Sequence, residues 1–501
     1  MTDSTKRLSG NTTLILRKEG WFSPLRLIRL LIVMFICILV AMVCALVSTT
    51  GIKGLNLKIQ SRASHEARFF CSPKNGDSFR DGVLPSHTKQ KKGLRPAAFN
   101  GFSVDVLQMT AAAPTESATA LPAPPAPHPV DFSRPVQPPK KSVFKLIGEV
   151  LDNGGPGYLQ FAITNLCNAD CGFCGFARSQ FDPKKRRSVT LREAQDVIDI
   201  AVKNHIGYLL FVGGEPLVHK ELRAMTRYAA ARGIKPMICT NGGLWTEQNM
   251  KDLASDGLSS VIMSIDAHDI AVHEKNRGLP DVCRKIKRAN EVFKTLGIQT
   301  TASITASRLI EDFEKLPAFL ESLGFESCTF SYPLTNLASS YLSFSEGGLV
   351  SFTKDELVVL FEKIKTMKHN SGYPVVNPTE SLDEMQRHLR GEKEKFGCLG
   401  GHKYFYLDWH LNLYRCHFWE TPMCNVYDWD DSKLIRDGCT RCMIDCYRDP
   451  SVLQFVAISA SDAWQAAKKG KLVTAAKHVF DSRNLTSLKA VWEDRKWVAK
   501  V

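Results

Sequence analysis

After residue 141 the chain alternates short apolar runs with longer segments in which apolar residues recur every three or four positions. The short runs, such as 158–164 (YLQFAIT) and 208–212 (YLLFV), are typical of buried strands. The longer segments, such as 191–205, are typical of helices that pack one face on a sheet. Six strands are expected in all, at 158–164, 208–212, 235–240, 260–265, 298–304 and 327–332.

A helix is expected after each of the first five strands, and a sixth helix is expected at 354–369. Strand–helix repeats of this kind form parallel sheets with right-handed crossovers. Six units are too few to close an eight-stranded barrel, so the sequence predicts an α/β fold, a partial (β/α)6 TIM-like barrel over 142–345. The chemistry of such barrels gathers at the carboxyl ends of the strands.

Three cysteines follow the first strand directly, with the spacing Cys167-x3-Cys171-x2-Cys174. Three thiolates on one loop can hold three irons of a [4Fe–4S] cluster and leave the fourth iron open for a ligand. A structural zinc site is the alternative, but it needs four ligands, commonly paired as C-x2-C. This spacing, with Phe173 before the last cysteine, resembles the signature of the radical S-adenosylmethionine (SAM) superfamily.

Other strand ends carry motifs that are similar to those of this superfamily. The GGEP motif of relatives is matched after the second strand, and its backbone and glutamate are implied to receive the amino group of SAM. The third and fourth strands end in TNGG and SID, where relatives line the SAM pocket. Thr305 and Ser307 follow the fifth strand and are weaker candidates. The implied cofactor-binding residues are Phe173, Gly213, Gly214, Glu215, Pro216, Asn241, Ser264 and Asp266.

The resemblance implies an enzyme with a [4Fe–4S] cluster on Cys167, Cys171 and Cys174, which are the catalytic residues, and with SAM as its second cofactor. Reductive cleavage of SAM would give a 5′-deoxyadenosyl radical, with the electron supplied by a donor such as flavodoxin or ferredoxin. The protein would hold the reactive carbon near the substrate and exclude water.

Six further cysteines lie near the C-terminus, in the 398–450 region that follows a helical connection at 346–397. They broadly resemble the cysteine-rich SPASM and twitch extensions, which bind auxiliary iron–sulfur clusters, although the usual turn glycine before Cys416 is absent. A zinc site or free thiols are the alternatives. Five of these cysteines are the expected ligands of a second [4Fe–4S] cluster: Cys398, Cys416, Cys439, Cys442 and Cys446; the sixth is Cys424.

The tail from Cys439 also resembles hopanoid-type radical SAM proteins, relatives of adenosylhopane synthase, whose radical adds to a lipid alkene. A small molecule or lipid is therefore the first substrate expectation. The alternatives are a peptide- or protein-modifying maturase and a non-catalytic iron–sulfur regulatory protein.

The net charge of +14 lies mostly in the first part of the chain. Residues 1–140 hold 18 Lys and Arg against 8 Asp and Glu, a balance of +10, which leaves +4 for the remaining 47 against 43. The barrel therefore carries no strong basic bias, and we expect no nucleic-acid partner.

The first 141 residues are expected to be non-globular: a basic tail at 1–29, a hydrophobic segment at 30–52 and a basic, Ala/Pro-rich linker at 53–141. Residues 30–47 contain no charge and are long enough to span a bilayer. Residues 52–100 hold ten Lys and Arg against three acidic residues, as in transit peptides. The alternatives are thus a membrane anchor, an organelle-targeting sequence, or a translation start further downstream.

The flanking charges favour a cytosolic N-terminus, whereas iron–sulfur chemistry favours a catalytic domain in a reducing compartment, either the cytoplasm or an organelle interior. The expected location is therefore membrane-associated, with its orientation open. Basic helices are expected at 451–501, either lying on a membrane surface or packed on the barrel.

Overall fold

A computed structural model describes residues 126–139, 141–179, 182–333, 336–337, 342–343, 348–493 and 495. The hydrophobic segment at 30–52 and most of the expected linker lie outside these residues. Within the described part of the chain, no helix has the length and apolar character needed to cross a membrane.

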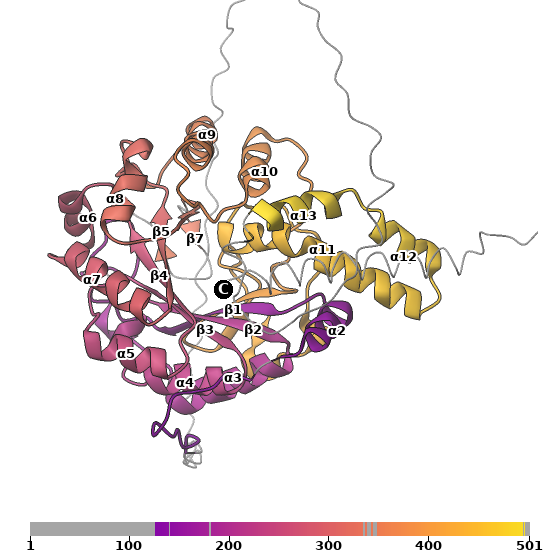
Figure 1. Cartoon of the computed structure of the whole chain (residues 1–501), viewed down its shortest axis with the longest axis horizontal. Helices are drawn as coiled ribbons and strands as arrows, with labels where there is room; N and C mark the ends of the chain where they lie inside the picture. Colours follow the sequence, from indigo (N-terminus) through magenta and orange to yellow (C-terminus); the bar gives the residue numbers. More distant parts are fainter. Residues whose placement is uncertain are drawn as a thin grey trace, which may run out of the picture. The chain divides into compact units, whose positions relative to one another are not determined.

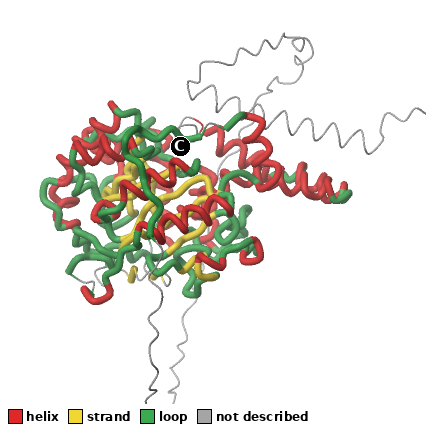
Figure 2. Tube along the Cα trace, turned by 90° about the horizontal axis from the view of Figure 1, so that it is seen from below, coloured by secondary structure: helices red, strands yellow, loops and turns green. Residues whose placement is uncertain are grey.

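The expected partial (β/α)6 barrel is confirmed. Six parallel strands run in chain order along one curved sheet, and helices cover its outer side (Figures 1 and 2). The strands are β1 (Gly157–Thr164), β2 (Ile206–Gly213), β3 (Lys235–Thr240), β4 (Ser260–Ile265), β5 (Gln299–Thr305) and β6 (Cys328–Ser331). The helices between them are α3 (Leu191–Lys203), α4 (Leu222–Ala231), α5 (Glu247–Ser255), α6 (Ile270–Arg277), α7 (Val282–Thr295) and α8 (Leu316–Ser322).

The two faces of the sheet differ in burial, because successive side chains along a strand point to opposite faces. On β5 the even-numbered residues from Thr300 to Ile304 are buried against the helices, whereas the odd-numbered residues from Gln299 to Thr305 are half-buried. The outer side chains join one large apolar core with the helices. The other face of the sheet, called the inner face below, therefore offers partly exposed side chains for chemistry.

Helix α6 was not expected from the sequence. Its only buried residues are His273 and Arg277, so it presents no apolar stripe to the core. Asp269 caps its N-terminus, and Gly278 ends it in the left-handed conformation with φ 59°. The only signals for this helix in the sequence were its start and stop residues, because the segment has no apolar periodicity.

The expected hairpin before Cys416 joins the barrel's own sheet. β9 (Tyr404–Leu407) pairs in parallel with β1, and β10 (Asn412–Tyr414) pairs with β9. Leu411 takes φ 65° where a turn glycine is usual. The Asp408 carboxylate holds that turn by accepting the His410 and Asn412 N–H groups at 2.8 and 2.9 Å.

The remaining elements flank this sheet (Figure 1). Ser142 caps α2, and α11 contacts α2, α12 and α13, so the C-terminal helices pack on one another and on α2. The helices are α2 (Val143–Asn153), α9 (Lys354–Asn370), α10 (Thr379–Arg390), α11 (Asp445–Lys468), α12 (Leu472–Val479) and α13 (Arg483–Glu493). Short strands are β7 (Asn336–Leu337), β8 (Leu342–Ser343) and β11 (Cys424–Asn425). The 3-10 turns are η1 (Pro183–Lys185), η2 (Pro216–Val218), η3 (Phe313–Lys315), η4 (Val426–Asp428) and η5 (Asp431–Lys433).

The expectation of an unpacked linker up to residue 141 is wrong for residues 126–139. The His128 backbone exchanges two hydrogen bonds with the buried Gln195 amide, at 2.7 and 2.9 Å. The Val136 N–H donates to the Ser255 carbonyl at 2.9 Å. The Phe132 ring covers two arginines of α4. Prolines do not prevent this packing, because the segment is extended and needs few backbone donors.

We therefore predict that a chain starting at residue 142 is less stable than one starting at residue 126. The shorter chain loses the two hydrogen bonds between His128 and Gln195, each with a net contribution of about 0.5–1.5 kcal/mol. Thermal unfolding of the two truncated chains should show a melting temperature lower by several degrees for the shorter one. Equal melting temperatures would contradict a stabilising role for residues 126–139.

Candidate functional site

The loop after β1 carries the three predicted cluster cysteines. Burial raises the pKa of all three thiols, that of Cys167 to about 12. The thiols of Cys167 and Cys174 both act electrostatically on Cys171, and all three cysteines lie on this one loop. The Ala169 N–H already donates to the Cys167 sulfur at 3.4 Å. These thiols are thus gathered at the carboxyl end of β1, as the sequence predicts.

The GGEP segment holds this loop in place. The Gly214 N–H donates to the Thr164 carbonyl at 2.8 Å, and the Glu215 N–H donates to the Leu166 carbonyl at 2.7 Å. A Cβ atom on Gly214 would overlap the Leu166 carbonyl oxygen, which explains the glycine. These two N–H groups hold the cysteine loop; an amino group donates hydrogen bonds, so the expected SAM contact would use carbonyl oxygens of this backbone and stays a prediction. Pro216 is buried and opens η2.

The Glu215 carboxylate is 1% exposed and accepts three hydrogen bonds. The donors are the Thr240 hydroxyl at 2.7 Å, the Asn241 N–H at 2.7 Å and the Leu217 N–H at 3.0 Å. A carboxylate offers about four acceptor positions, so one remains for a further donor. Burial raises the pKa of Glu215. This arrangement fits an ammonium group, the role that the family resemblance implies.

Asn241 connects the end of β3 to the cysteine loop. Its side-chain amide donates to the Asn168 oxygen at 2.8 Å and lies 3.9 Å from the Cys167 sulfur. The Asn241 side-chain oxygen accepts the Gly243 N–H at 2.8 Å. Asn241 thus links the end of β3 to Asn168 and Cys167, and its contact with SAM stays a prediction.

Asp266 forms a buried ion pair with Arg277 of α6, at 2.6 Å. The other carboxylate oxygen of Asp266 accepts the Asn276 amide at 2.8 Å and lies 3.7 Å from the His273 ring. Burial alone would raise the pKa of Asp266, but the Arg277 guanidinium brings it below its usual range. Both oxygens accept a hydrogen bond from α6, so Asp266 holds Arg277 in place, and its predicted contact with SAM stays a prediction.

Arg277 faces the predicted cluster. Its positive charge lowers the pKa of the Cys171 and Cys174 thiols, against the larger effect of burial. Its carbonyl accepts the Asp170 N–H of the cysteine loop at 2.8 Å. Its Nε atom is buried and has no hydrogen-bond partner. Sequence reasoning missed Arg277 because α6 itself was missed.

The other candidates lie close to these elements. Ser264 is half-buried on the inner face and donates toward the neighbouring Cys239 thiol. Phe173 is 7% exposed within the cysteine loop. Thr305 is half-buried at the end of β5, whereas Ser307 is buried and lies 3.5 Å from the Asp266 carbonyl. Ser264 and Thr305 therefore reach the inner face, and Ser307 is structural.

A second group of thiols gathers in the C-terminal region. We call Cys398, Cys416, Cys439 and Cys442 the four-thiol set. The thiols of Cys398 and Cys439 act electrostatically on Cys442, and those of Cys398 and Cys442 act on Cys416. The Cys398 N–H donates to the Cys439 carbonyl at 2.8 Å.

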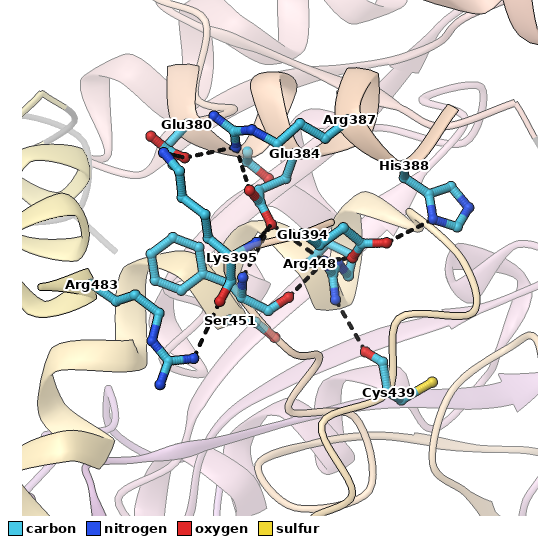
Figure 3. Close-up of polar contacts among 12 residues, drawn as sticks. Glu380, Glu384, Arg387, His388, Glu394, Lys395, Cys439, Arg448, Ser451 and Arg483 are labelled. Carbon is cyan, nitrogen blue, oxygen red and sulfur yellow. Dashed lines mark hydrogen bonds and ion pairs between the residues drawn. The ribbon is translucent and has the colours of Figure 1, made fainter. Parts of the chain in front are cut away.

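Two buried arginines flank the four-thiol set. Arg448 is 2% exposed and donates to the carbonyls of Cys439 and Phe396 at 3.2 and 2.8 Å, while Glu394 pairs with the same guanidinium (Figure 3). Arg415 makes two 2.8 Å hydrogen bonds to the Asp437 carboxylate, beside Cys439. Such cations offset the charge of thiolates.

Two of the six C-terminal cysteines have other groups as the main influences on their pKa. The groups that shift the pKa of Cys424 are Lys433 and two aspartates of the same loop, with no cysteine among them. Those that act on Cys446 are Asp445, Gln160 and Asp449. The expected role of Cys446 as a ligand stays a prediction: its side chain packs on the same apolar cluster as Cys398, Cys416 and Cys442. Cys446 is the second residue of α11 and lies beside Gln160 of β1.

All twelve cysteines in the described residues are free thiols. No three His, Cys, Asp or Glu side chains of those residues are already arranged to hold a metal ion. The chemistry of the donors nevertheless fits iron–sulfur clusters at both places, with three thiols on one loop and four in the second set.

We predict that Asp266→Asn and Arg277→Gln each destabilise the protein by about 3–5 kcal/mol, because each leaves one buried charge unpaired. The double variant should lose clearly less than the sum, since it leaves neither charge. Urea unfolding of the four proteins measures this coupling. Additive losses would contradict a direct interaction between the two residues.

Comparison with known proteins agrees with this geometry. Residues 161–316 match the model of the Radical SAM superfamily. The AdoMet-dependent heme synthase of Oleidesulfovibrio alaskensis is 27% identical over 177 residues, 35% of this chain and 45% of that protein. The GTP 3′,8-cyclase of Synechococcus elongatus is 32% identical over 115 residues, 23% of this chain and 35% of that protein. The chain thus spans less than half the length of these relatives.

Among solved structures, Streptococcus suis SuiB bound to its precursor peptide SuiA aligns with 58% of this chain and 67% of SuiB, at 15% identity and a TM-score of 0.44. The family match covers the strands and loops that carry Cys167, Glu215, Asn241, Asp266 and Arg277. Residues 161–316 are therefore similar to the Radical SAM superfamily.

Proposed function

We propose that the protein is a radical SAM enzyme that holds a [4Fe–4S] cluster on Cys167, Cys171 and Cys174. The observation that carries the proposal is the gathering of these three thiols beside Glu215 and Arg277 at the carboxyl ends of β1 to β4. When bound, the cluster and SAM supply reductive cleavage of a C–S bond, which gives methionine and a 5′-deoxyadenosyl radical.

The residues of this chain then have separate roles. Glu215 keeps one acceptor position for the ammonium group of SAM, next to the thiol of Cys167. Arg277 offsets the negative charge of the thiolates, and Asp266 holds its guanidinium in place. Asn241 fixes the distance between β3 and the cysteine loop. These contacts orient the reacting groups before any chemistry occurs.

The inner face favours a polar substrate over a hydrocarbon. Half-buried hydroxyl groups line it on β4, β5 and β6, and those of Ser303 and Ser331 lie 3.4 Å apart. An apolar polycyclic lipid would offer these hydroxyl groups no hydrogen bond beyond those that they make with one another. A polar small molecule or a polar peptide segment can replace the water around them. This weakens the hopanoid-like alternative.

A second iron–sulfur cluster on the four-thiol set is the further part of the proposal. Four thiolates complete the coordination of a cluster, so this one would have no open iron. Arg415 and Arg448 would offset its charge, as their electrostatic effects on Cys398 indicate. It would transfer electrons, since it has no place for SAM or substrate.

Replacing any one of Cys167, Cys171 and Cys174 with Ala should abolish formation of 5′-deoxyadenosine, because the cluster loses a ligand. The measurement is chromatography of the products after anaerobic reduction with dithionite in the presence of SAM. Cys283→Ala, which removes a thiol from the apolar core on α7, is the matched control and should keep cleavage. Cleavage retained in a cysteine-loop variant would refute the proposal.

Cys439→Ala and Cys442→Ala should each lower the iron content by about four atoms per chain, the content of one cubane cluster. Cys424→Ala, whose thiol lies outside the four-thiol set, should keep the wild-type content. Iron and sulfide quantitation on anaerobically reconstituted protein makes the comparison. Unchanged iron in the first two variants would exclude a cluster at this place.

A further inference from the structure

The N-terminus of α11 closes the side of the barrel at which β1 and β6 do not pair. Asp445 is the first residue of α11, and its carboxylate accepts the Tyr332 N–H, just after β6, at 2.8 Å. The next residue, Cys446, lies beside Gln160 of β1. This short segment therefore spans the opening and brings two side chains to the inner face.

The Cys446 thiol is held by its neighbour. Its sulfur lies 3.6 Å from the second Asp445 oxygen, so the thiol donates to that carboxylate. Cys446 as a whole is half-buried, and its thiol lies beside Gln160 of the inner face. Burial and the nearby Asp445 charge raise the pKa of Cys446, so the sulfur keeps its proton.

Gln160 gives an independent sign of a ligand at this place. Its side chain points to the inner face and is 3% exposed. Its Nε2 amide lies toward the Cys446 sulfur but makes no hydrogen bond of normal geometry. Buried amide donors are almost always paired. An acceptor atom of a bound molecule, such as a carbonyl or hydroxyl oxygen, would satisfy it.

Cys446 also faces the end of the barrel where the SAM residues gather. Tyr158 of β1 lies near both Cys446 and Cys239, since both thiols act on its hydroxyl. Cys239 in turn lies beside Ser264 and within the electrostatic range of Glu215. The inner face thus continues from Glu215, by way of Cys239 and Tyr158, to Cys446.

We propose that Cys446 donates a hydrogen atom to a carbon radical of a polar substrate whose oxygen binds the Gln160 amide. The inference rests on the proposed radical SAM function. The S–H bond breaks and a C–H bond forms, so the substrate radical is quenched and a thiyl radical remains. One electron from a one-electron donor protein and one proton from Asp445 restore the thiol.

Asp445 is suited to that proton transfer. Burial raises its pKa to about 6, so that the carboxyl group exchanges protons near neutral pH. The assignment places the reaction among those that end by forming a C–H bond, such as radical additions and rearrangements.

The test uses the full chain with SAM and dithionite in D2O, without added substrate. Thiol hydrogens exchange with the solvent, so a radical that takes its hydrogen from Cys446 yields 5′-deoxyadenosine with one deuterium. Mass spectrometry should show this label for the wild type and its loss for Cys446→Ala. Cys239→Ala, the matched inner-face variant, should keep the label.

Cys446→Ser should lose the label as well, because it keeps the polar contact with Asp445 while its O–H bond is too strong to donate. Cys446→Ala and Cys446→Ser should both keep the wild-type iron content, which is measured independently of activity. Cys442→Ala should have a lower iron content. A label retained in both Cys446 variants, or an unlabelled product from the wild type, would overturn the inference. Iron lost from the Cys446 variants would make Cys446 a ligand and also overturn it. No 5′-deoxyadenosine from the wild type would refute the proposed function, and with it the inference.

Discussion

The buried Asp266–Arg277 ion pair is the interaction on which the site depends. It joins the end of β4 to α6. The Arg277 carbonyl of α6 in turn accepts a hydrogen bond from the Asp170 N–H of the cysteine loop. A buried cation next to thiols is unfavourable without its own counter-ion, because desolvation costs several kcal/mol per charge. Asp266 therefore makes it possible for Arg277 to face Cys171 and Cys174. The position of the thiols and the charge around them are set by one contact.

Most of the barrel could be predicted from the sequence because its strands are buried on one side by regular apolar residues. The six expected strands agree with β1 to β6 within two residues at each end, and five of the helices were expected as well. Helix α6 was missed since its buried side is polar, built on His273 and Arg277. Apolar periodicity cannot detect a helix whose contact with the protein is an ion pair.

Only part of the site could be predicted from the sequence. Spacing placed Cys167, Cys171 and Cys174 on one loop, and strand ends placed Glu215 and Asp266 near them. Spacing cannot tell which polar group is already paired, however. Asp266 was expected to contact SAM, and the structure shows that its carboxylate also pairs with Arg277. The GGEP backbone was expected to receive the SAM amino group, and its Gly214 N–H also holds the Thr164 carbonyl. Tertiary partners, which lie far apart in the chain, decide whether a polar group is free for a ligand.

The C-terminal region is part of the same sheet rather than an appendage. β9 pairs with β1 over Tyr158 to Phe161, so the strand that leads to Cys167 also supports the hairpin that leads to Cys416. A shift of one residue in this pairing would turn Gln160 from the inner face to the outer core, because side chains alternate along a strand. The register of β1 thus fixes both thiol groups and the inner face between them. A substrate held there would lie between the loop of Cys167 and the start of α11, which is the geometry that a radical reaction with a protein hydrogen donor requires.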